Sequence, residues 1–473
     1  MKKLVITAVL LLSMVLMLVG CNQPEEKPSA TPVPSVGPSQ PTTLNAINAG
    51  EVYRYYVWST DDENDPFRDA GARNQSLTEK WHAYEAEKSI TIQYVKATGG
   101  HNWFDLPRSS AASGEPICDI FNVGGPYVVL GTAFYNGSLD SCLLPISDYS
   151  DYGKFDDAEY WDLQSQEICT FSDKLYCVVP QPYGADYIAN HTVTLFNNEI
   201  LEDAGYSIDE LYTASKNGEW TWDEFKEAAI KCSSPDKGIY GTSLGDNIAL
   251  GSALIVTNGG HYFQKKDGVD VFVGNQTNAI DAWTFIADLA NQNAVLTDFS
   301  TEANSFGQGK VGMLVTTISR LGAIYQYLKF EYGIINPPKG PDAQDYISEV
   351  NWFVPISVMK GANNPAGCVQ ILSEYFRPEY GMSSVENTQL IDAELRAYLL
   401  DQGSLDTAMN ITKYTSVENY FLYQTVTDGT TQMLQYLYGN VGKFISGEEA
   451  PQAFYDGVKP AIDKMVLDAM AKS

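Results

Sequence analysis

The sequence predicts an α/β protein with two lobes, and three observations lead to that prediction. Strand-like and helix-like segments alternate after residue 50, which is typical of helices packed on sheets. That region has roughly 420 residues, more than one ordinary hydrophobic core organises, so it favours two units. The sequence has no internal repeat, which a solenoid or a propeller would require.

The N-terminus has the pattern of a secretory signal. Two lysines precede an apolar run over residues 4–19, which ends at Gly20 and Cys21. A charged start, a short apolar stretch and small residues before a cut are typical of an exported chain. Because cysteine follows the cut, the pattern resembles a bacterial lipobox, with residues 1–20 removed and Cys21 lipid-modified. A membrane-spanning helix is the alternative, but the run of roughly 16 residues is short for a span of ~20.

Residues 21–50 are expected to form a tether. Six prolines lie among Ser, Thr and Glu with almost no apolar side chain to bury: Pro24, Pro28, Pro32, Pro34, Pro38 and Pro41. Such a stretch favours extended conformations of roughly 3 Å per residue. We therefore expect Cys21 and the tether to hold a globular body at the outer face of the cell membrane.

The charge of the chain limits its partners. The formal net charge of -29 becomes -31 once the two lysines of the signal are removed. Nucleic acids and anionic lipid headgroups are bound by basic patches, so this composition disfavours both as partners. A neutral solute is compatible with it.

Six cysteines follow Cys21, and none has the CxxC spacing of a zinc or redox site. Cys169 and Cys177 flank a hairpin expected around Asp173, which would place them opposite each other. An exported chain permits a disulfide there. Buried free thiols are an equally good interpretation, and the sequence leaves the choice open.

The expected strands and helices follow from local composition. Residues rich in β-formers predict strands at 52–58, 90–95 and 117–123, and a helix is expected at 78–88. A second amphipathic helix is expected at 279–291.

Two helix starts show the spacing of a capping box, Thr221 with Glu224 and Ser446 with Glu449. After Thr221, apolar residues recur at helical spacing and predict a buried face. Its members are Trp222, Phe225, Ala228, Ala229 and Cys232.

Three motifs resemble functional sites but lack their context. Residues 241–245 match G-x-S-x-G, yet the only histidine downstream, His261, is too near in the chain for a hydrolase, so we expect a turn at a strand end. Residues 307–312 match G-x-G-x-x-G, but a strand-like segment follows where a helix is required. Residues 61–72 begin like a calcium loop but lack its glycine and its final carboxylate. We expect no catalytic residue, no metal and no cofactor.

Six segments in a fixed order resemble the extracellular solute-binding protein family 1, the sugar-binding group that includes the maltose-binding proteins. The segments are CDIFN at 118–122 with LLPISDY at 143–149, DKLYCVVP at 173–180, LFNNEILEDAG at 195–205, WTWDEF at 220–225, SFGQGKVGM at 305–313 and IINPPKGP at 334–341. Each is short, and their shared order is what identifies the family.

The resemblance implies a type II periplasmic-binding-protein fold, with a hinge that the chain crosses several times and a ligand cleft between the lobes. The expected first lobe is 51–183 plus 306–358, and the expected second lobe is 184–305 plus 359–473. The implied function is capture of a small solute, a sugar or oligosaccharide, and delivery to an ABC permease by a monomeric protein that is not an enzyme.

Candidate ligand contacts are aromatic or polar residues at strand ends and in glycine-rich loops, because sugars stack on aromatic faces and bond planar polar groups. They are Trp58, Asn122, Tyr127, Asp186, Tyr187, Asn258, Arg320, Trp352 and Tyr420. Arg320 stands where the family often has a glycine, which admits an acidic sugar or another anionic solute.

Two other functions remain open. A secreted carbohydrate-active hydrolase could act through two carboxylates that sequence spacing does not reveal. A sensory solute-binding protein, for a non-sugar or anionic solute, would have the same sequence features.

Overall fold

The computed structural model describes residues 45–57, 72–96, 104–122, 137–181, 185–245, 249–267, 269–298, 300–350, 353, 355–375, 384–418, 423, 426 and 431–471. The chain divides after Thr43 into two units, and all described residues belong to Leu44–Ser473. Among them, no helix combines the length and the apolar character that crossing a membrane requires.

The first sheet has five strands in the order β2-β1-β3-β15-β6. Their bounds are β1 (Val52–Val57), β2 (Thr91–Lys96), β3 (Ile120–Asn122), β15 (Ile356–Val358) and β6 (Cys177–Val178). β1 runs parallel to β2 and β3, whereas β15 is antiparallel to β3 and β6. Tyr53, Tyr55 and Tyr56 of β1 are all buried, as expected of a strand covered on both faces. All three expected strands are thus confirmed. The strands expected at 52–58 and 90–95 differ from β1 and β2 by no more than one residue at each end, and the strand expected at 117–123 is present as the shorter β3.

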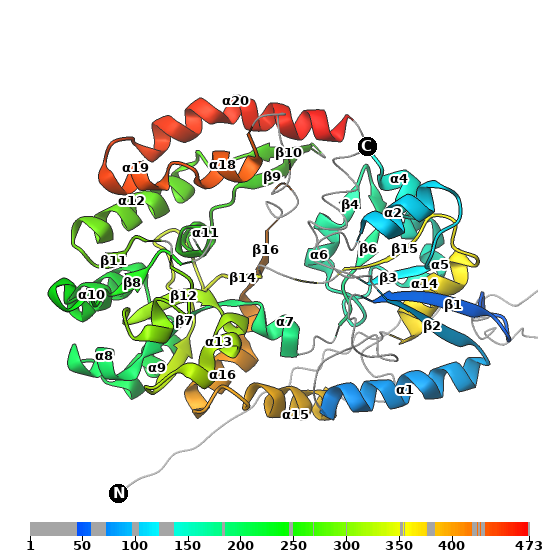
Figure 1. Ribbon diagram of the computed structural model, residues 1–473, viewed down its shortest axis with the longest axis horizontal. Coiled ribbons are helices and arrows are strands. Elements are labelled where there is room, and N and C mark those ends of the chain that lie inside the picture. Colours follow the sequence, from blue (N-terminus) through cyan, green and yellow to red (C-terminus); the bar gives the residue numbers. More distant parts are fainter. Residues whose placement is uncertain are drawn as a thin grey trace, which may run out of the picture. The chain divides into compact units, whose positions relative to one another are not determined.

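Helices pack on this sheet, and Figure 1 shows the longest, α1, beside β1 and β2. The ring of Trp81 on α1 meets Tyr55 of β1 edge to face, with 6.1 Å between centroids. The helices are α1 (Ala72–Lys88), α2 (Asp105–Ala112), α4 (Leu139–Cys142), α5 (Ser150–Gly153), α6 (Leu163–Ile168) and α14 (Pro365–Tyr375). The expected helix at 78–88 is therefore present and begins six residues earlier, at Ala72.

The second sheet has three antiparallel strands in the order β12-β7-β13. They are β7 (Thr192–Asn197), β12 (Met313–Thr317) and β13 (Tyr332–Ile335). β7 lies in the centre and all six of its residues are buried. Two further pairs lie nearby in the chain, β8 (Thr242–Ser243) with β11 (Val295–Leu296) and β14 (Ser348–Val350) with β16 (Thr415–Val417).

The strand pairing divides the chain differently from the expected lobe boundaries. β12 was expected in the first lobe, but it pairs with β7, with Met313 opposite Phe196. Residues 359–375 were expected in the second lobe, but α14 packs on α5 and β15 of the first sheet. We therefore call the described residues of 45–181 and 353–375 the first lobe, and those of 185–350 and 384–471 the second lobe.

The second lobe carries most of the helices, and Figure 1 shows α20 beside β10 (Val269–Phe272). They are α7 (Ala185–Ala189), α8 (Asn198–Asp203), α9 (Ile208–Lys216), α10 (Trp222–Cys232), α11 (Ala249–Thr257), α12 (Thr277–Asn291), α13 (Ile318–Ile324), α15 (Ser384–Leu395), α16 (Gln402–Asn410), α18 (Met433–Tyr438), α19 (Val441–Ser446) and α20 (Pro451–Met470). The helix expected at 279–291 corresponds to α12.

Of the two expected capping boxes, the helix cap at Thr221 is confirmed and the one at Ser446 is wrong. Thr221 caps α10, since its side chain accepts a hydrogen bond from the backbone N–H of Glu224, and the five apolar residues predicted for that helix are buried. Ser446 instead ends α19, and Gly447 follows it with φ of 73°, a left-handed residue that closes the helix. α20 begins only at Pro451.

The hairpin expected around Asp173 is present. β4 (Thr170–Phe171) pairs with β5 (Lys174–Leu175), and Ser172 and Asp173 form the turn with φ of 48° and 62°. Cys169 and Cys177 lie on either side of it as buried free thiols.

Candidate functional site

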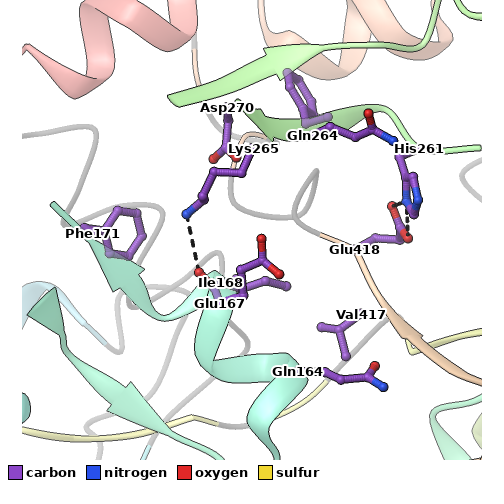
Figure 2. Close-up of a pocket in the computed structure, with 11 residues that line it drawn as sticks. Gln164, Glu167, Ile168, Phe171, His261, Gln264, Lys265, Asp270, Val417 and Glu418 are labelled. Atoms are coloured by element: carbon purple, nitrogen blue, oxygen red, sulfur yellow. Dashed lines mark hydrogen bonds and ion pairs between the residues drawn. The ribbon is translucent and has the colours of Figure 1, made fainter. Parts of the chain in front are cut away.

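A pocket of about 320 Å³ is lined by both lobes. Figure 2 shows α6 and β4 of the first lobe facing the hairpin of β9 (Phe263–Lys266) and β10, with the end of β16 beside them. The volume lies at the lower end of the range of about 300–1,000 Å³ typical of small-molecule sites. The lining residues are Gln164, Glu167, Ile168, Phe171, His261, Phe263, Gln264, Lys265, Asp270, Val417 and Glu418.

The first-lobe wall depends on Asp162, which caps the N-terminus of α6. Its buried carboxylate accepts hydrogen bonds from the backbone N–H of Gln164, at 3.2 Å, and from the hydroxyl of Ser165. A capping carboxylate fixes where a helix begins and how its first turn is oriented. As a result Gln164 and Glu167 are exposed at the pocket, whereas Ile168 is buried.

The second-lobe wall is a hairpin that is held to its lobe by two buried phenylalanines. Phe263 pairs with Phe272 across the strands, and both rings are buried against the lobe. The intervening residues Gln264 and Lys265 are exposed at the pocket. Lys265 reaches the first lobe, because its Nζ lies 3.5 Å from the carbonyl oxygens of both Glu167 and Thr170.

A histidine and a glutamate face each other at the end of β16. Nδ1 of His261 lies 3.0 and 3.2 Å from the two carboxylate oxygens of Glu418, and the hydroxyl of Ser416 donates to the same carboxylate at 2.9 Å. The Glu418 side chain is 2% exposed and that of His261 is 34% exposed. The hydrogen bond to Glu418 raises the pKa of His261 and outweighs its burial, which acts in the opposite direction.

The pocket can bind a solute that is both polar and partly apolar. Donors come from Gln164, Gln264 and Lys265, and acceptors from the carboxylates of Glu167 and Asp270. Phe171, Ile168 and Val417 supply apolar surface. A few convergent polar groups beside aromatic and aliphatic surface are typical of sites for small polar solutes.

Two of the motifs set aside above lack the context of catalytic or nucleotide sites. Ser243 is a buried residue of β8, and its hydroxyl accepts a hydrogen bond from the backbone N–H of Gly245 at 3.2 Å, so the G-x-S-x-G match is a turn at a strand end. The glycines of 307–312 precede strand β12, not a helix. Residues 61–71, the start of the calcium-loop match, lie outside the described residues. Within the described part of the chain, no group of His, Cys, Asp and Glu is arranged to hold a metal ion.

Three of the sequence-predicted contacts have described side chains, and none of the three lines the pocket. Tyr187 is buried in α7 and donates its hydroxyl proton to Asp162 at 3.0 Å. Asn258 is buried, and its amide bonds the carbonyl of Asn278 and the backbone N–H of Asp342. Arg320 on α13 is 49% exposed, with Nε 3.8 Å from a carboxylate oxygen of Glu302.

The other predicted residues are not described at the level of side chains. Asn122 ends β3 and Asp186 lies in α7, but only their backbones are described. The remaining predictions lie outside the described residues: Cys21, Trp58, Tyr127, Trp352 and Tyr420.

Sequence reasoning did not select the residues that line this pocket, although several lie next to ones that it did. His261 comes three residues after Asn258, and Glu418 two residues before Tyr420. Trp352 and Tyr420 follow Val350 and Val417, which are partners in the parallel pair of β14 and β16. Glu418 could have been found from its position directly after the strand of residues 415–417 and two residues before the predicted contact Tyr420.

Comparison with known proteins gives one family and one fold. The model of the family described as bacterial extracellular solute-binding protein matches residues 70–382. No curated protein sequence matches the chain.

Solved structures of low sequence identity share the architecture. The cyclic alpha-maltosyl-1,6-maltose binding protein from Arthrobacter globiformis has a TM-score of 0.62 at 15% identity, over 89% of this chain and 99% of its own. The galacto-N-biose-/lacto-N-biose I-binding protein from Bifidobacterium longum has a TM-score of 0.59 at 14% identity, over 89% and 98%. MalE, the sugar-binding protein from Xanthomonas citri, has 0.58 at 13%, over 88% and 97%. The two-lobed type II fold predicted from the sequence is confirmed by these structures.

Proposed function

Because this chain belongs to the bacterial extracellular solute-binding protein family, we propose that it captures a sugar or oligosaccharide between its lobes and delivers it to an ABC permease. The observation that carries the proposal is the pocket lined by both lobes, with α6 on one side and the β9–β10 hairpin on the other. A solute that contacts both walls stabilises the arrangement in which the walls face each other. Similar structures whose names specify sugars support the choice of solute class.

Further contacts come from the predicted residues near the pocket in sequence. Trp352 and Tyr420 follow the paired ends of β14 and β16, and we propose both as aromatic surfaces for the solute. Trp58 comes directly after β1, and Asn122 is the last residue of the neighbouring parallel strand β3. We propose both, together with Tyr127, as solute contacts from the first lobe. Asp186, Tyr187, Asn258 and Arg320 remain proposed contacts as well, although the hydrogen bonds of Tyr187 and Asn258 within the protein favour structural roles for these two.

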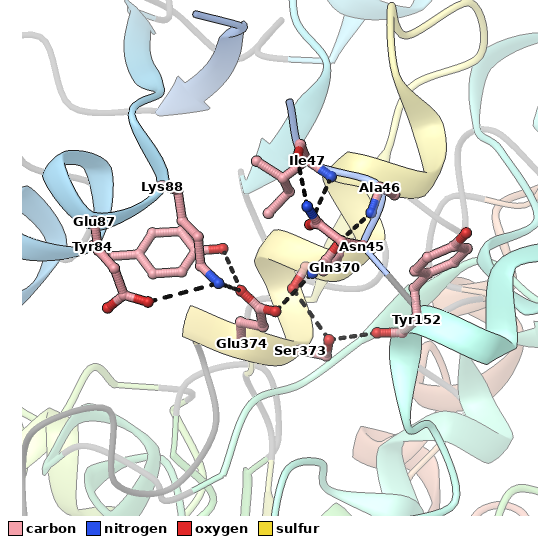
Figure 3. A network of polar contacts seen from close by, with 10 residues as sticks. All are labelled: Asn45, Ala46, Ile47, Tyr84, Glu87, Lys88, Tyr152, Gln370, Ser373 and Glu374. Atoms are coloured by element: carbon pink, nitrogen blue, oxygen red, sulfur yellow. Dashed lines mark hydrogen bonds and ion pairs between the residues drawn. The ribbon is translucent and has the colours of Figure 1, made fainter. Parts of the chain in front are cut away.

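The membrane attachment is part of the proposal. The lipobox-like sequence at Cys21 and the proline-rich stretch support a lipid anchor and a tether. The tether is shorter than the expected 21–50, because residues 45–50 belong to the first lobe and Ile47 is buried there. Figure 3 shows where the chain enters this lobe: the backbone N–H of Ala46 donates to the side chain of Gln370 at 2.6 Å. Gln370 in turn donates to Glu374 at 2.7 Å, which pairs with Lys88 of α1 at 2.8 Å. Labelling of cells with radioactive palmitate tests the anchor, since a Cys21→Ala variant would carry no label and a Cys232→Ala control would keep it.

A thermal-shift screen tests the solute. The chain from Asn22 to Ser473 would be melted with neutral mono-, di- and oligosaccharides, including maltotetraose and lacto-N-biose, and with uronates. A solute that binds only the folded state contributes about 2.7 kcal/mol at one hundred times its Kd, which raises the melting temperature. A shift with one sugar class, and recovery of that sugar unchanged, supports capture. Breakdown of the sugar would favour a hydrolase, and no shift with any sugar would contradict the proposal.

A further inference from the structure

The imidazole of His261 is oriented by a buried carboxylate and exposed to the pocket. Nδ1 faces Glu418 at 3.0 Å, so Nδ1 carries a proton in both the neutral and the charged ring. Among the described residues, Nε2 hydrogen-bonds to no protein group. It follows that Nε2 is the ring atom left to meet a solute, as a donor when the ring is charged and as an acceptor when it is neutral.

Burial of Glu418 favours the charged ring. A carboxylate that is 2% exposed is costly unless it is paired and hydrogen-bonded, and here its partners are His261 and the hydroxyl of Ser416. The same hydrogen bond raises the pKa of His261. The pair therefore holds a charged N–H donor at the pocket under mildly acidic conditions.

We propose that His261 is a specificity-determining hydrogen-bond donor to the bound solute, positioned by Glu418, and that the acceptor is an uncharged oxygen of a sugar. This inference rests on the proposed function, because it assigns a contact within the same pocket. His261 acts from the second lobe, opposite Gln164 and Glu167 of α6 in the first lobe. A sugar that bridges the two would be held by donors and acceptors from both walls.

The charges around His261 favour a neutral acceptor over a carboxylate. The groups that line the pocket with it are Glu418 beside β16, Glu167 on α6, Lys265 on β9 and Asp270 on β10. Three carboxylates thus surround two cationic side chains, and Lys265 already lies near two carbonyl oxygens. A uronate would bring a fourth negative charge close to these three carboxylates, and repulsion between like charges would oppose its binding.

The proposal implies a pH-dependent affinity with a definite sign. Below the pKa of His261 the ring offers a charged Nε2–H, and a charge-assisted bond is about twice as strong as a neutral one. As the pH rises through that pKa the donor is lost and affinity falls. Removal of one charged hydrogen bond corresponds to roughly ten-fold weaker binding.

The test is calorimetric titration with the sugar that gives the largest thermal shift, between pH 5.5 and 8.5. The variants are His261→Gln and Glu418→Gln in the chain from Asn22 to Ser473, and their melting curves show whether each is folded. His82→Gln is the matched control, because His82 forms the same kind of pair with Glu85, at 2.9 Å, on the exposed surface of α1.

We expect wild type and His82→Gln to bind more weakly as the pH rises. His261→Gln is expected to bind about ten-fold more weakly than wild type at low pH, with a flat profile. Glu418→Gln removes the carboxylate that stabilises the charged ring, so the midpoint of the profile should move to lower pH while affinity at the lowest pH is retained. A merely structural role for Glu418 would lower affinity at every pH.

Three results would overturn the inference, and the first two separate it from the proposed function. If a sugar binds with equal affinity at all pH values and His261→Gln matches wild type, His261 is not a contact, while sugar capture stands. If only uronates bind, the neutral-acceptor assignment is wrong. If no sugar binds at all, both the inference and the proposed function fail.

Discussion

His191 and Thr415 are 224 residues apart in the chain, yet Nε2 of His191 lies 2.8 Å from the hydroxyl oxygen of Thr415. Nδ1 of the same ring lies 3.1 Å from the carbonyl of Tyr187 and so carries the proton of the neutral ring, while the Thr415 hydroxyl donates to the carbonyl of Thr412 at 2.9 Å. This buried, neutral imidazole links the residue before β7 to the first residue of β16, and both strands belong to the second lobe.

Stability should fall on acidification because of this histidine. Burial lowers the pKa of His191 to about 4, whereas an unfolded chain protonates it near 6.5. Between those two values the unfolded state binds more protons, so the free energy of unfolding decreases as the pH falls through this window, by at most about 3 kcal/mol. We expect His191→Gln to be less stable than wild type at pH 7 and to lose less stability between pH 7 and 4.5. Urea unfolding at several pH values measures this, and parallel pH profiles would contradict it.

The six cysteines of the body should be free and unreactive in the folded protein. All six are buried. Burial, together with the hydrogen bond between the thiols of Cys169 and Cys177, raises the pKa of Cys169 well above its usual value. Titration with a thiol-reactive chromophore, without reductant, should detect almost none of them in buffer and all six in denaturant. Detection of only four in denaturant would show a disulfide, and peptide mapping would identify whether Cys169 and Cys177 form it.

Position 340 should not tolerate a side chain, because Asn258 packs directly against Gly340. A Cβ at position 340 would lie 2.5 Å from the side-chain oxygen of Asn258 and 2.6 Å from its Cα, so Gly340→Ala requires the loop to move. Such overpacking costs about 1–3 kcal/mol. Gly457→Ala is the control, because nothing lies within 4 Å of that Cβ and alanine favours the interior of α20 by about 0.5–1 kcal/mol. Equal melting temperatures for the two variants would contradict this account.

The segment that leads into the first lobe should loosen when Gln370 is truncated. The Gln370 side chain accepts from the backbone of Ala46 and donates to Glu374, so Gln370→Ala removes the bond that holds residue 46 to α14. We expect limited proteolysis to cut this variant after residue 45 faster than wild type, as seen by mass spectrometry of the new N-terminus. Gln292→Ala, on the surface after α12, should leave the rate unchanged. Unchanged cleavage in Gln370→Ala would show that the other bonds of the segment suffice.

Sequence reasoning succeeded where local chemistry decides the structure. The cap at Thr221, the hairpin turn at Asp173 and the strand around Tyr55 all follow from residues within a few positions of one another. It failed for Ser446, because the four-residue spacing of a capping box also occurs where a glycine ends a helix. The family was recognised because many short segments kept their order.

Long-range pairing explains what could not be predicted. The lobe to which residues 313–317 belong depends on the register of β12 against β7, more than a hundred positions away in the chain. His261 and Glu418 are separated by 157 positions, and no spacing rule connects them. Asn258 was expected to contact a solute because it precedes two glycines, but its amide is satisfied by residues that only the folded chain brings near.

The bonds that tie Ala46 to Gln370 of α14 and to Asn364 just before that helix determine which part of the protein bears a mechanical load. Any pull transmitted along the preceding residues acts on the first lobe, through α14 and its neighbour α1. Among the described residues, none of Asn45, Ala46 and Ile47 hydrogen-bonds to the second lobe, which carries His261 and the β9–β10 hairpin. If the chain is anchored as proposed, the first lobe is the fixed base and the second is the moving arm, so the work of closing on a solute does not include dragging the anchor.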